Sequence, residues 1–204
     1  MRAVLILANI NKIDKSLLNN ALIIGVDRGA YIASTMNIKM DIAIGDFDSV
    51  NSFELELIKK STKSLIKLNP IKDLTDTKEA IKLCDGYSEI IILGGIKGNR
   101  IEHFYANLLL IENDPRIKLI DENSLIEVRN KSFIPNDNYK YISFFSIADE
   151  AILTLEGFKY NLNSYLLKEN DSLCISNEIE NNPYVKIEKG RILVIYSKND
   201  HEEI

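Results

Sequence analysis

Short apolar segments recur through the first 120 residues, and each is followed by a polar loop. They cover residues 3–7, 22–26, 41–44, 64–68, 89–93 and 117–120. Apolar runs without alternating polar residues are typical of strands that are buried on both faces. Helices are expected between them at 30–36, from Asn51 or Ser52 onward, at 77–84 and at 101–112. This alternation predicts an α/β fold with a mostly parallel sheet flanked by helices.

The pattern changes after Asp121. Apolar segments at 125–128, 141–145, 152–155, 164–167, 173–175, 185–187 and 192–196 are short, and none has a helical period. Short strands at such close intervals predict a small antiparallel sandwich or barrel. We therefore expect an N-terminal α/β domain over residues 1–121 and a C-terminal all-β domain over 125–204.

The composition excludes several classes of partner. A net charge of −5 over 204 residues gives no general attraction to nucleic acid or to an anionic membrane surface. The N-terminal apolar run is too short for a signal peptide, and no run approaches the roughly 18 residues that span a bilayer. Cys84 and Cys174 lack metal-ligand spacing and form no disulfide framework. We expect a cytoplasmic protein with reduced cysteines.

Two carboxylates stand one residue apart in the segment 45–49, which reads Gly-Asp-Phe-Asp-Ser and follows the strand expected at 41–44. Asp46 and Asp48 repel each other unless a cation or hydrogen bonds compensate their charge. Mg²⁺ suits such a pair because it takes oxygen ligands, usually one or two carboxylates together with substrate phosphates. The alternative is a solvated turn in which Asp48 caps the next helix, since Asp and Gly are common turn residues.

Three further polar loops follow expected parallel strands, so all four loops are expected at the ligand-binding edge of the sheet. They contain Asp27-Arg28-Gly29, then Lys72-Asp73-Leu74-Thr75-Asp76, and a glycine-rich stretch at 94–100 with Lys97 and Arg100. Carboxylates for a metal, cations for phosphate and glycines for close approach suit phosphoryl or pyrophosphoryl transfer from a nucleotide. The chain has neither a P-loop nor a Gly-x-Ser-x-Gly elbow, which argues against Walker-type ATPases and acyl transfer.

In order and approximate spacing, these loops resemble those of the thiamine pyrophosphokinase (thiamine diphosphokinase) family. The resemblance rests on segments 27–30, 45–49, 72–76 and 94–107, with Ser176-Asn177 and residues 190–194 in the second half. It implies a catalytic α/β domain that binds nucleotide and metal. It further implies a β-sandwich domain for thiamine binding and dimerisation, in a homodimer whose active sites lie between subunits. The implied reaction is Mg²⁺-dependent transfer of the pyrophosphoryl group of ATP to the hydroxyl of thiamine, giving thiamine diphosphate and AMP.

The resemblance also implies roles for the matching residues. The metal-binding acids are Asp46, Asp48 and Asp76, which together with Lys72 and Arg100 form the catalytic set. Asp48 or Asp76 is expected to orient or deprotonate the thiamine hydroxyl. The thiamine-binding residues are Ser176, Asn177 and Glu102. The ATP-binding residues are Asp27, Arg28, Gly29, Lys72, Thr75, Arg100 and His103.

The fourth motif departs from the family pattern Gly-Gly-Arg-x-Asp-His, because Asn99 replaces a glycine and Glu102 replaces an aspartate. A catalytic group misplaced by about 1 Å can lose ~10²-fold in rate. The chain also lacks Trp, so an aromatic contact to thiamine must come from Tyr184, Tyr165, Phe158 or another ring. Two alternatives therefore remain at this stage: a pyrophosphokinase for another alcohol such as a hydroxymethylpterin, and a thiamine or nucleotide sensor without turnover.

Overall fold

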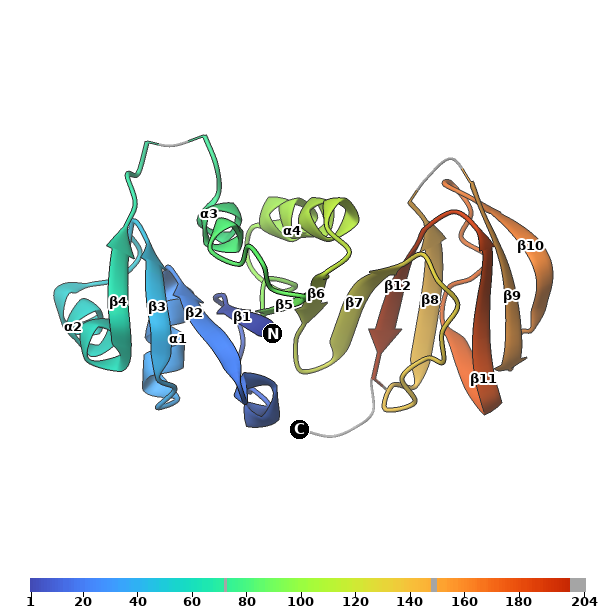
Figure 1. Ribbon diagram of the computed structural model, residues 1–204, viewed down its shortest axis with the longest axis horizontal. Coiled ribbons are helices and arrows are strands. Elements are labelled where there is room, and N and C mark those ends of the chain that lie inside the picture. The colour runs from blue at the N-terminus through green and yellow to red at the C-terminus, as the bar shows by residue number, and fades with distance from the viewer. Residues whose placement is uncertain (72, 148–149, 199–204) are drawn as a thin grey trace. The chain divides into compact units, whose positions relative to one another are not determined.

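A computed structural model describes residues 1–71, 73–147 and 150–198 (Figure 1). The chain divides into two compact units. The N-terminal unit contains Met1–Leu110 and Arg116–Glu122, and the C-terminal unit contains Ile111–Pro115 and the chain from Asn123 onward. None of the described helices is long and apolar enough to cross a membrane.

The sheet of the N-terminal unit is parallel throughout its described pairings, which confirms the predicted parallel α/β architecture. Its strands are ordered β6-β5-β1-β2-β3-β4. Their bounds are β1 Arg2–Ile6, β2 Ala21–Val26, β3 Met40–Gly45, β4 Thr62–Lys67, β5 Glu89–Leu93 and β6 Ile117–Ile120.

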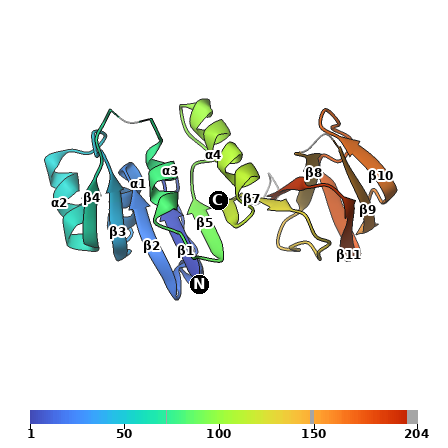
Figure 2. The same cartoon turned by 45° about the horizontal axis from the view of Figure 1, so that its top comes forward.

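Four α-helices of the described chain connect these strands: α1 Arg28–Thr35, α2 Ser52–Ser61, α3 Asp76–Lys82 and α4 Ile101–Asn113. In Figures 1 and 2, α3 and α4 lie on one face of the sheet, and α1 and α2 lie on the other. The side chain of Asn51 caps α2 by accepting a hydrogen bond from Glu54 N. The helix thus begins at Ser52, one of its two predicted starting residues. A 3₁₀ helix at Lys15–Leu18 has no counterpart in the predictions, because one short turn carries no periodic signal.

The strand order creates a crevice at the centre of this sheet. The chain moves outward from β1 to β4 and then returns to place β5 on the other side of β1. In open α/β sheets, the loops at such a reversal diverge at the carboxyl ends of the strands and leave room for a ligand. Fully buried side chains from β1, β3, β5 and α1 fix this frame, among them Val4, Ile6, Ala43, Leu93 and Ala33.

The described pairings of the C-terminal unit are antiparallel. The strands are β7 Ser124–Arg129, β8 Tyr141–Ser146, β9 Glu150–Phe158, β10 Leu162–Lys168, β11 Asn177–Lys189 and β12 Ile192–Ser197, ordered β10-β9-β11-β8-β12-β7. β11 pairs with β8 at Asn177 and Glu178, and with β9 at Ile179, Tyr184–Ile187 and Lys189, with a register shift on each side of Tyr184–Ile187.

The strand predicted at 173–175 is wrong, because these residues form a turn and bend. Leu173 and Ile175 are 61% and 47% exposed, so burial does not draw this segment into a sheet. The Leu173 amide instead donates to Oδ1 of Asp171 over 2.9 Å, an Asx-type bond that competes with strand pairing. The following strand, β11, is longer than the strand predicted at 185–187.

Candidate active site

A cleft of about 770 Å³ opens at the carboxyl ends of the strands in the N-terminal unit. The loops after β1, β2, β3 and β5 line it, together with the beginnings of α3 and α4. Predicted ATP, metal or catalytic residues that line it are Asp27, Arg28, Asp46, Thr75, Asp76, Arg100 and His103. Lys72, predicted to contact phosphate, lies outside the described residues.

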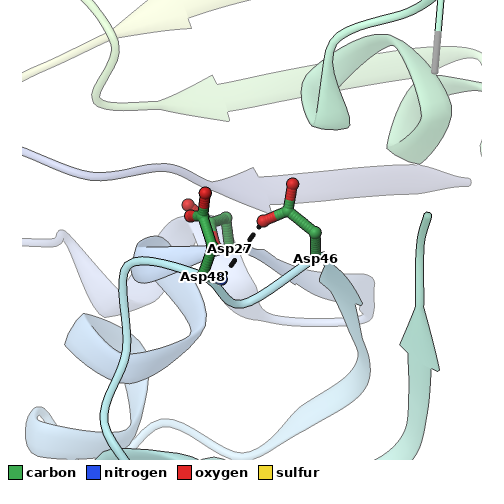
Figure 3. A group of neighbouring side chains, drawn as sticks. All are labelled: Asp27, Asp46 and Asp48. Atoms are coloured by element: carbon green, nitrogen blue, oxygen red, sulfur yellow. Dashed lines mark hydrogen bonds between the residues drawn. The ribbon is translucent and has the colours of Figure 1, made fainter. Parts of the chain in front are cut away.

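The turn at Phe47 explains how the acidic segment after β3 is built. Phe47 has a left-handed φ of 58° and is only 6% exposed, because its ring packs into the apolar core. Residues 46 and 48 flank this anchored ring, and Asp48 N donates to Oδ1 of Asp46 over 3.2 Å (Figure 3). The backbone amide thus compensates part of the repulsion between the two carboxylates.

Asp27 joins this pair from the end of β2. Its backbone adopts φ 48° and ψ −125°, which is uncommon for a residue with a side chain. Asp27 N donates to Ile44 O over 2.8 Å, and Ser49 Oγ donates to Oδ2 of Asp27 over 3.0 Å. The other oxygen, Oδ1, is buried without a hydrogen-bond partner among the described residues. An uncompensated buried carboxylate oxygen of this kind is costly unless a cation binds it.

Oxygen atoms of Asp27, Asp46 and Asp48 all lie within 4.8 Å of one another (Figure 3). Burial raises the pKa of Asp27, and the carboxylates of Asp76 and Asp46 raise it further, against the opposing hydrogen bonds from the Ser49 side chain and the Arg28 backbone. A divalent cation would relieve both causes, because it supplies positive charge and takes oxygen ligands. The donor set therefore fits Mg²⁺.

The predicted metal set was Asp46, Asp48 and Asp76, with Asp27 assigned to ATP. Among the described residues, the cluster instead groups Asp27 with Asp46 and Asp48. Asp76 stands at the first position of α3, close enough to raise the pKa of Asp27. Spacing along the chain does not predict whether Asp27 or Asp76 lies nearer to Asp46 and Asp48. That distance depends on the parallel pairing of β2 with β3.

Thr75, predicted to contact ATP, also caps α3. Its Oγ1 accepts from Lys78 N over 3.2 Å. This bond satisfies one of the free amides at the beginning of the helix and holds Thr75 and Asp76 at the wall of the cleft. Gly29, another predicted ATP contact, is buried in α1, and a Cβ there would lie 2.1 Å from Ile6 O.

Side-chain amides support the glycine-rich loop after β5. Asn107 Nδ2 donates to Gly95 O over 3.1 Å, and Asn9 Nδ2 donates to Lys97 O over 3.2 Å. Asn9 is not among the predicted site residues, although it lies in the loop after β1, a position that matches that of the other site loops. Lys97 lines the cleft and forms ion pairs with Asp121 at 3.5 Å and Glu122 at 3.3 Å.

Arg100 and Glu102 interact at the beginning of α4. Arg100 Nε lies 2.8 Å from Glu102 Oε1, and the side chains are 70% and 62% exposed. The hydrogen bond from Arg100 lowers the pKa of Glu102 below its ordinary value. The replacement of the family's aspartate by Glu102 therefore leaves a charged group beside the cleft-lining Arg100.

Ser176 and Asn177, predicted to bind thiamine, lie at the beginning of β11 in the C-terminal unit. Ser176 is exposed and has φ 55°. Asn177 is 3% exposed and bonds both backbone groups of Tyr160, accepting from N at 3.1 Å and donating to O at 2.8 Å. The side chain of Asn177 thus holds the local backbone, while Ser176 beside it is an exposed residue.

Comparison with known proteins assigns both halves of the chain. The family described as "Thiamin pyrophosphokinase, catalytic domain" matches residues 13–120, and "Thiamin pyrophosphokinase, vitamin B1 binding domain" matches residues 131–192. The thiamine pyrophosphokinase of Bacillus subtilis (strain 168) is 33% identical over 184 residues, which cover 85% of this chain and 86% of the relative.

Solved structures agree with this match over the whole chain. The crystal structure of thiamine pyrophosphokinase from Bacillus subtilis superposes with a TM-score of 0.86 at 28% identity, covering 98% of this chain and 100% of that one. A thiamin pyrophosphokinase family protein from Enterococcus faecalis superposes with a TM-score of 0.85 at 26% identity, with the same coverage of both chains. The motifs, the parallel sheet with its acidic cleft, and these matches together establish that the chain belongs to the thiamine pyrophosphokinase family.

Proposed function

We propose that this chain transfers the pyrophosphoryl group of ATP to the hydroxyl of thiamine, giving thiamine diphosphate and AMP, with Mg²⁺ bound in the cleft. The observation that carries the proposal is the cluster of Asp27, Asp46 and Asp48 at the carboxyl ends of β2 and β3. Such a cluster suits pyrophosphoryl transfer, where positioning and charge stabilisation supply most of the catalysis.

Asp27, Asp46 and Asp48 would hold the Mg²⁺ ion, which when bound offsets the negative charge of the phosphates. The fit rests on the buried Oδ1 of Asp27 and on the mutual proximity of the three carboxylates. Asp76, the first residue of α3 after the Thr75 cap, would contribute a further carboxylate to the metal.

Other residues of the site bind the nucleotide, orient the thiamine hydroxyl or accept its proton. Arg100 and the predicted contact Lys72 offset charge on the phosphates, and Gly94 and Gly95 let backbone approach the nucleotide. Both glycines have left-handed φ angles, 86° and 76°, that side-chain-bearing residues rarely adopt. Asp48 or Asp76 orients or deprotonates the thiamine hydroxyl, a task for a carboxylate within hydrogen-bond reach of that oxygen.

In this proposal, residues 1–121 bind the nucleotide and the metal. Residues 125–204 form a β-sandwich that binds thiamine and dimerises. Ser176 would reach thiamine from the partner subunit of a homodimer, with Asn177 holding the backbone beside it, and Glu102 would contact thiamine from the first subunit. The exposed position of Ser176 supports this assignment. A two-fold dimer would then contain two equivalent sites, each built from both chains.

The test is product formation by Asp46→Asn and Asp48→Asn, followed as AMP and thiamine diphosphate by chromatography. Each change removes a charged ligand from the cluster, and we expect a rate loss on the order of 10²-fold or more. Asp85→Asn, at an exposed position, is the matched control and should keep full activity. Full-speed turnover by folded Asp46→Asn and Asp48→Asn proteins would refute the metal site, and turnover of a hydroxymethylpterin in place of thiamine would refute the substrate.

A mixing experiment tests the shared site. Asp46→Asn and Ser176→Ala proteins are each assayed alone and after denaturation and refolding together. In a shared-site homodimer, the mixed dimers regain activity because one of their two sites carries neither substitution. Activity equal to the mean of the separate proteins would place each site within one subunit.

A further inference from the structure

Arg28 directly follows Asp27, yet its guanidinium is directed toward protein groups of the neighbouring loop. Its Nη1 donates to Ser49 O over 2.8 Å, and its Nη2 lies 3.5 Å from Glu54 Oε1. Its Cζ lies 5.4 Å from the ring centroid of Tyr31, within the range of a cation–π contact. Two nitrogens and one face of the guanidinium are therefore engaged within the N-terminal unit.

These contacts connect the two loops that carry the carboxylate cluster. Arg28 donates to the backbone of Ser49, and Ser49 in turn donates through its hydroxyl to Asp27. Asp27 lies between β2 and α1, Arg28 is the first residue of α1, and Ser49 immediately follows Asp48 in the loop after β3. These two hydrogen bonds together restrain the distance between Asp27 and Asp48.

Glu54 anchors this connection to α2. Its side chain is only 12% exposed, and its Oε2 accepts from Asn51 N over 2.9 Å in the capping box of the helix. The same carboxylate therefore faces the beginning of α2 with one oxygen and Arg28 with the other. An ion pair held by such a fixed carboxylate loses less side-chain entropy than an exposed pair of flexible chains.

We propose that Arg28 is a positioning residue for the carboxylate cluster: through Ser49 and Glu54 it holds the loop after β3 at the separation from Asp27 that a divalent cation requires. This differs from the expectation that Arg28 contacts ATP. The inference rests on the proposed metal site. Groups that orient metal ligands typically change metal affinity by about 10–100-fold when they are removed.

The test uses variants that separate two properties of Arg28: its bridge to Ser49 and Glu54, and its positive charge. Arg28→Lys keeps a positive charge but has one nitrogen, which cannot satisfy Ser49 O and Glu54 at the spacing of a guanidinium fork. Glu54→Gln keeps an acceptor for the capping box and removes the charge that pairs with Arg28. Lys59→Met, on the same helix and in an exposed ion pair with Glu56, is the matched control.

The readouts are Mn²⁺ binding to the full chain without nucleotide, from the electron paramagnetic resonance of free Mn²⁺, and amide exchange of residues 46–51 without metal. We expect Arg28→Lys to weaken Mn²⁺ binding about tenfold and to speed amide exchange in this segment. Glu54→Gln should shift both measurements in the same direction by a smaller factor, and combining it with Arg28→Lys should add little. Lys59→Met should change neither measurement.

Unchanged Mn²⁺ affinity and exchange in Arg28→Lys, with a raised KM for ATP, would overturn the inference and make Arg28 a direct phosphate contact. Asp48→Asn separates this failure from failure of the metal site itself. Loss of Mn²⁺ binding in Asp48→Asn but not in Arg28→Lys rejects only the positioning role. Retention of Mn²⁺ binding in Asp48→Asn rejects the proposed site on which the inference rests.

Discussion

Gly45 at the end of β3 leaves no room for a side chain on the side that faces Asp27, which follows the end of β2. A Cβ on Gly45 would lie 2.9 Å from Cα and 3.1 Å from Cβ of Asp27. The absence of a side chain at residue 45 therefore lets the two acidic loops meet. The glycine is required here for close approach and not for an unusual φ angle.

Gly45→Ala should destabilise the protein by about 1–3 kcal/mol, because the added methyl group overpacks against backbone that cannot rotate away. It should also weaken Mn²⁺ binding by displacing Asp27. Urea denaturation and metal titration measure the two effects. Gly86→Ala is the comparison: Gly86 has φ 81°, and a Cβ there meets no atom of the described chain within 4 Å. That variant should lose about 1 kcal/mol from backbone strain and keep its metal affinity.

Asp27→Asn should stabilise the metal-free protein at neutral pH. Burial raises the pKa of Asp27, so the folded state favours its protonated form. The stability that this preference contributes is present at low pH and is lost as pH rises through the raised pKa. The advantage of the asparagine variant should therefore grow as pH rises from about 4 toward neutrality, because Asp in unfolded chains titrates near 3.9. Urea denaturation in EDTA across this range checks the sign, and a gap that widens toward acid contradicts it.

Divalent metal should raise the melting temperature of the unmodified protein, because an ion that binds the folded state alone stabilises it by mass action. Asp27→Asn should lose most of this increase, since it lacks one of the clustered carboxylates. Scanning calorimetry with MgCl₂, MnCl₂ and EDTA measures the shift. Equal metal-induced shifts in both proteins would show that the ion binds elsewhere.

Phe47→Ala should cost about 3–5 kcal/mol, as expected for the loss of a buried aromatic side chain. Phe47→Leu should cost under about 1.5 kcal/mol, because an apolar side chain of similar size still fills the site. We expect the alanine variant to lose metal affinity as well, since the buried ring anchors the turn between Asp46 and Asp48. Metal binding is compared at a temperature where both variants are folded by circular dichroism. Wild-type metal affinity in the alanine variant would show that the anchor is dispensable for the cluster.

Ser176→Ala and Asn177→Ala should affect different properties, namely thiamine binding and stability. Asn177→Ala removes the hydrogen-bond partner of the N–H and C=O groups of Tyr160 in two part-buried bonds, which should cost about 1–2 kcal/mol of stability. Ser176→Ala should leave stability within about 0.5 kcal/mol of the original value, because the residue is exposed. It should instead raise KM for thiamine, as measured by steady-state kinetics. An unchanged KM in Ser176→Ala would remove this hydroxyl from the thiamine site.

The sequence alone determined the alternation of strands and helices, because burial on both faces of a parallel sheet imposes continuous apolar runs such as residues 3–7 and 89–93. It also located the polar loops, since each begins where such a run ends. The wrong strand at 173–175 shows the limit of this reasoning. Three residues contain too little pattern to distinguish a strand from a turn that Asp171 closes through its own side chain.

Only the tertiary structure decided which acids meet. Residues 27, 46, 48 and 76 all follow apolar segments or begin a helix, and nothing in their spacing orders the distances between them. The parallel pairing of β2 with β3 brings the first three together, and Gly45 leaves free the space that a side chain would fill against Asp27. The bridge from Arg28 to Ser49 and Glu54 depends on the same pairing. Local sequence sets what each segment can form, whereas contacts between distant segments depend on strand order and packing, which emerge when the whole sheet assembles.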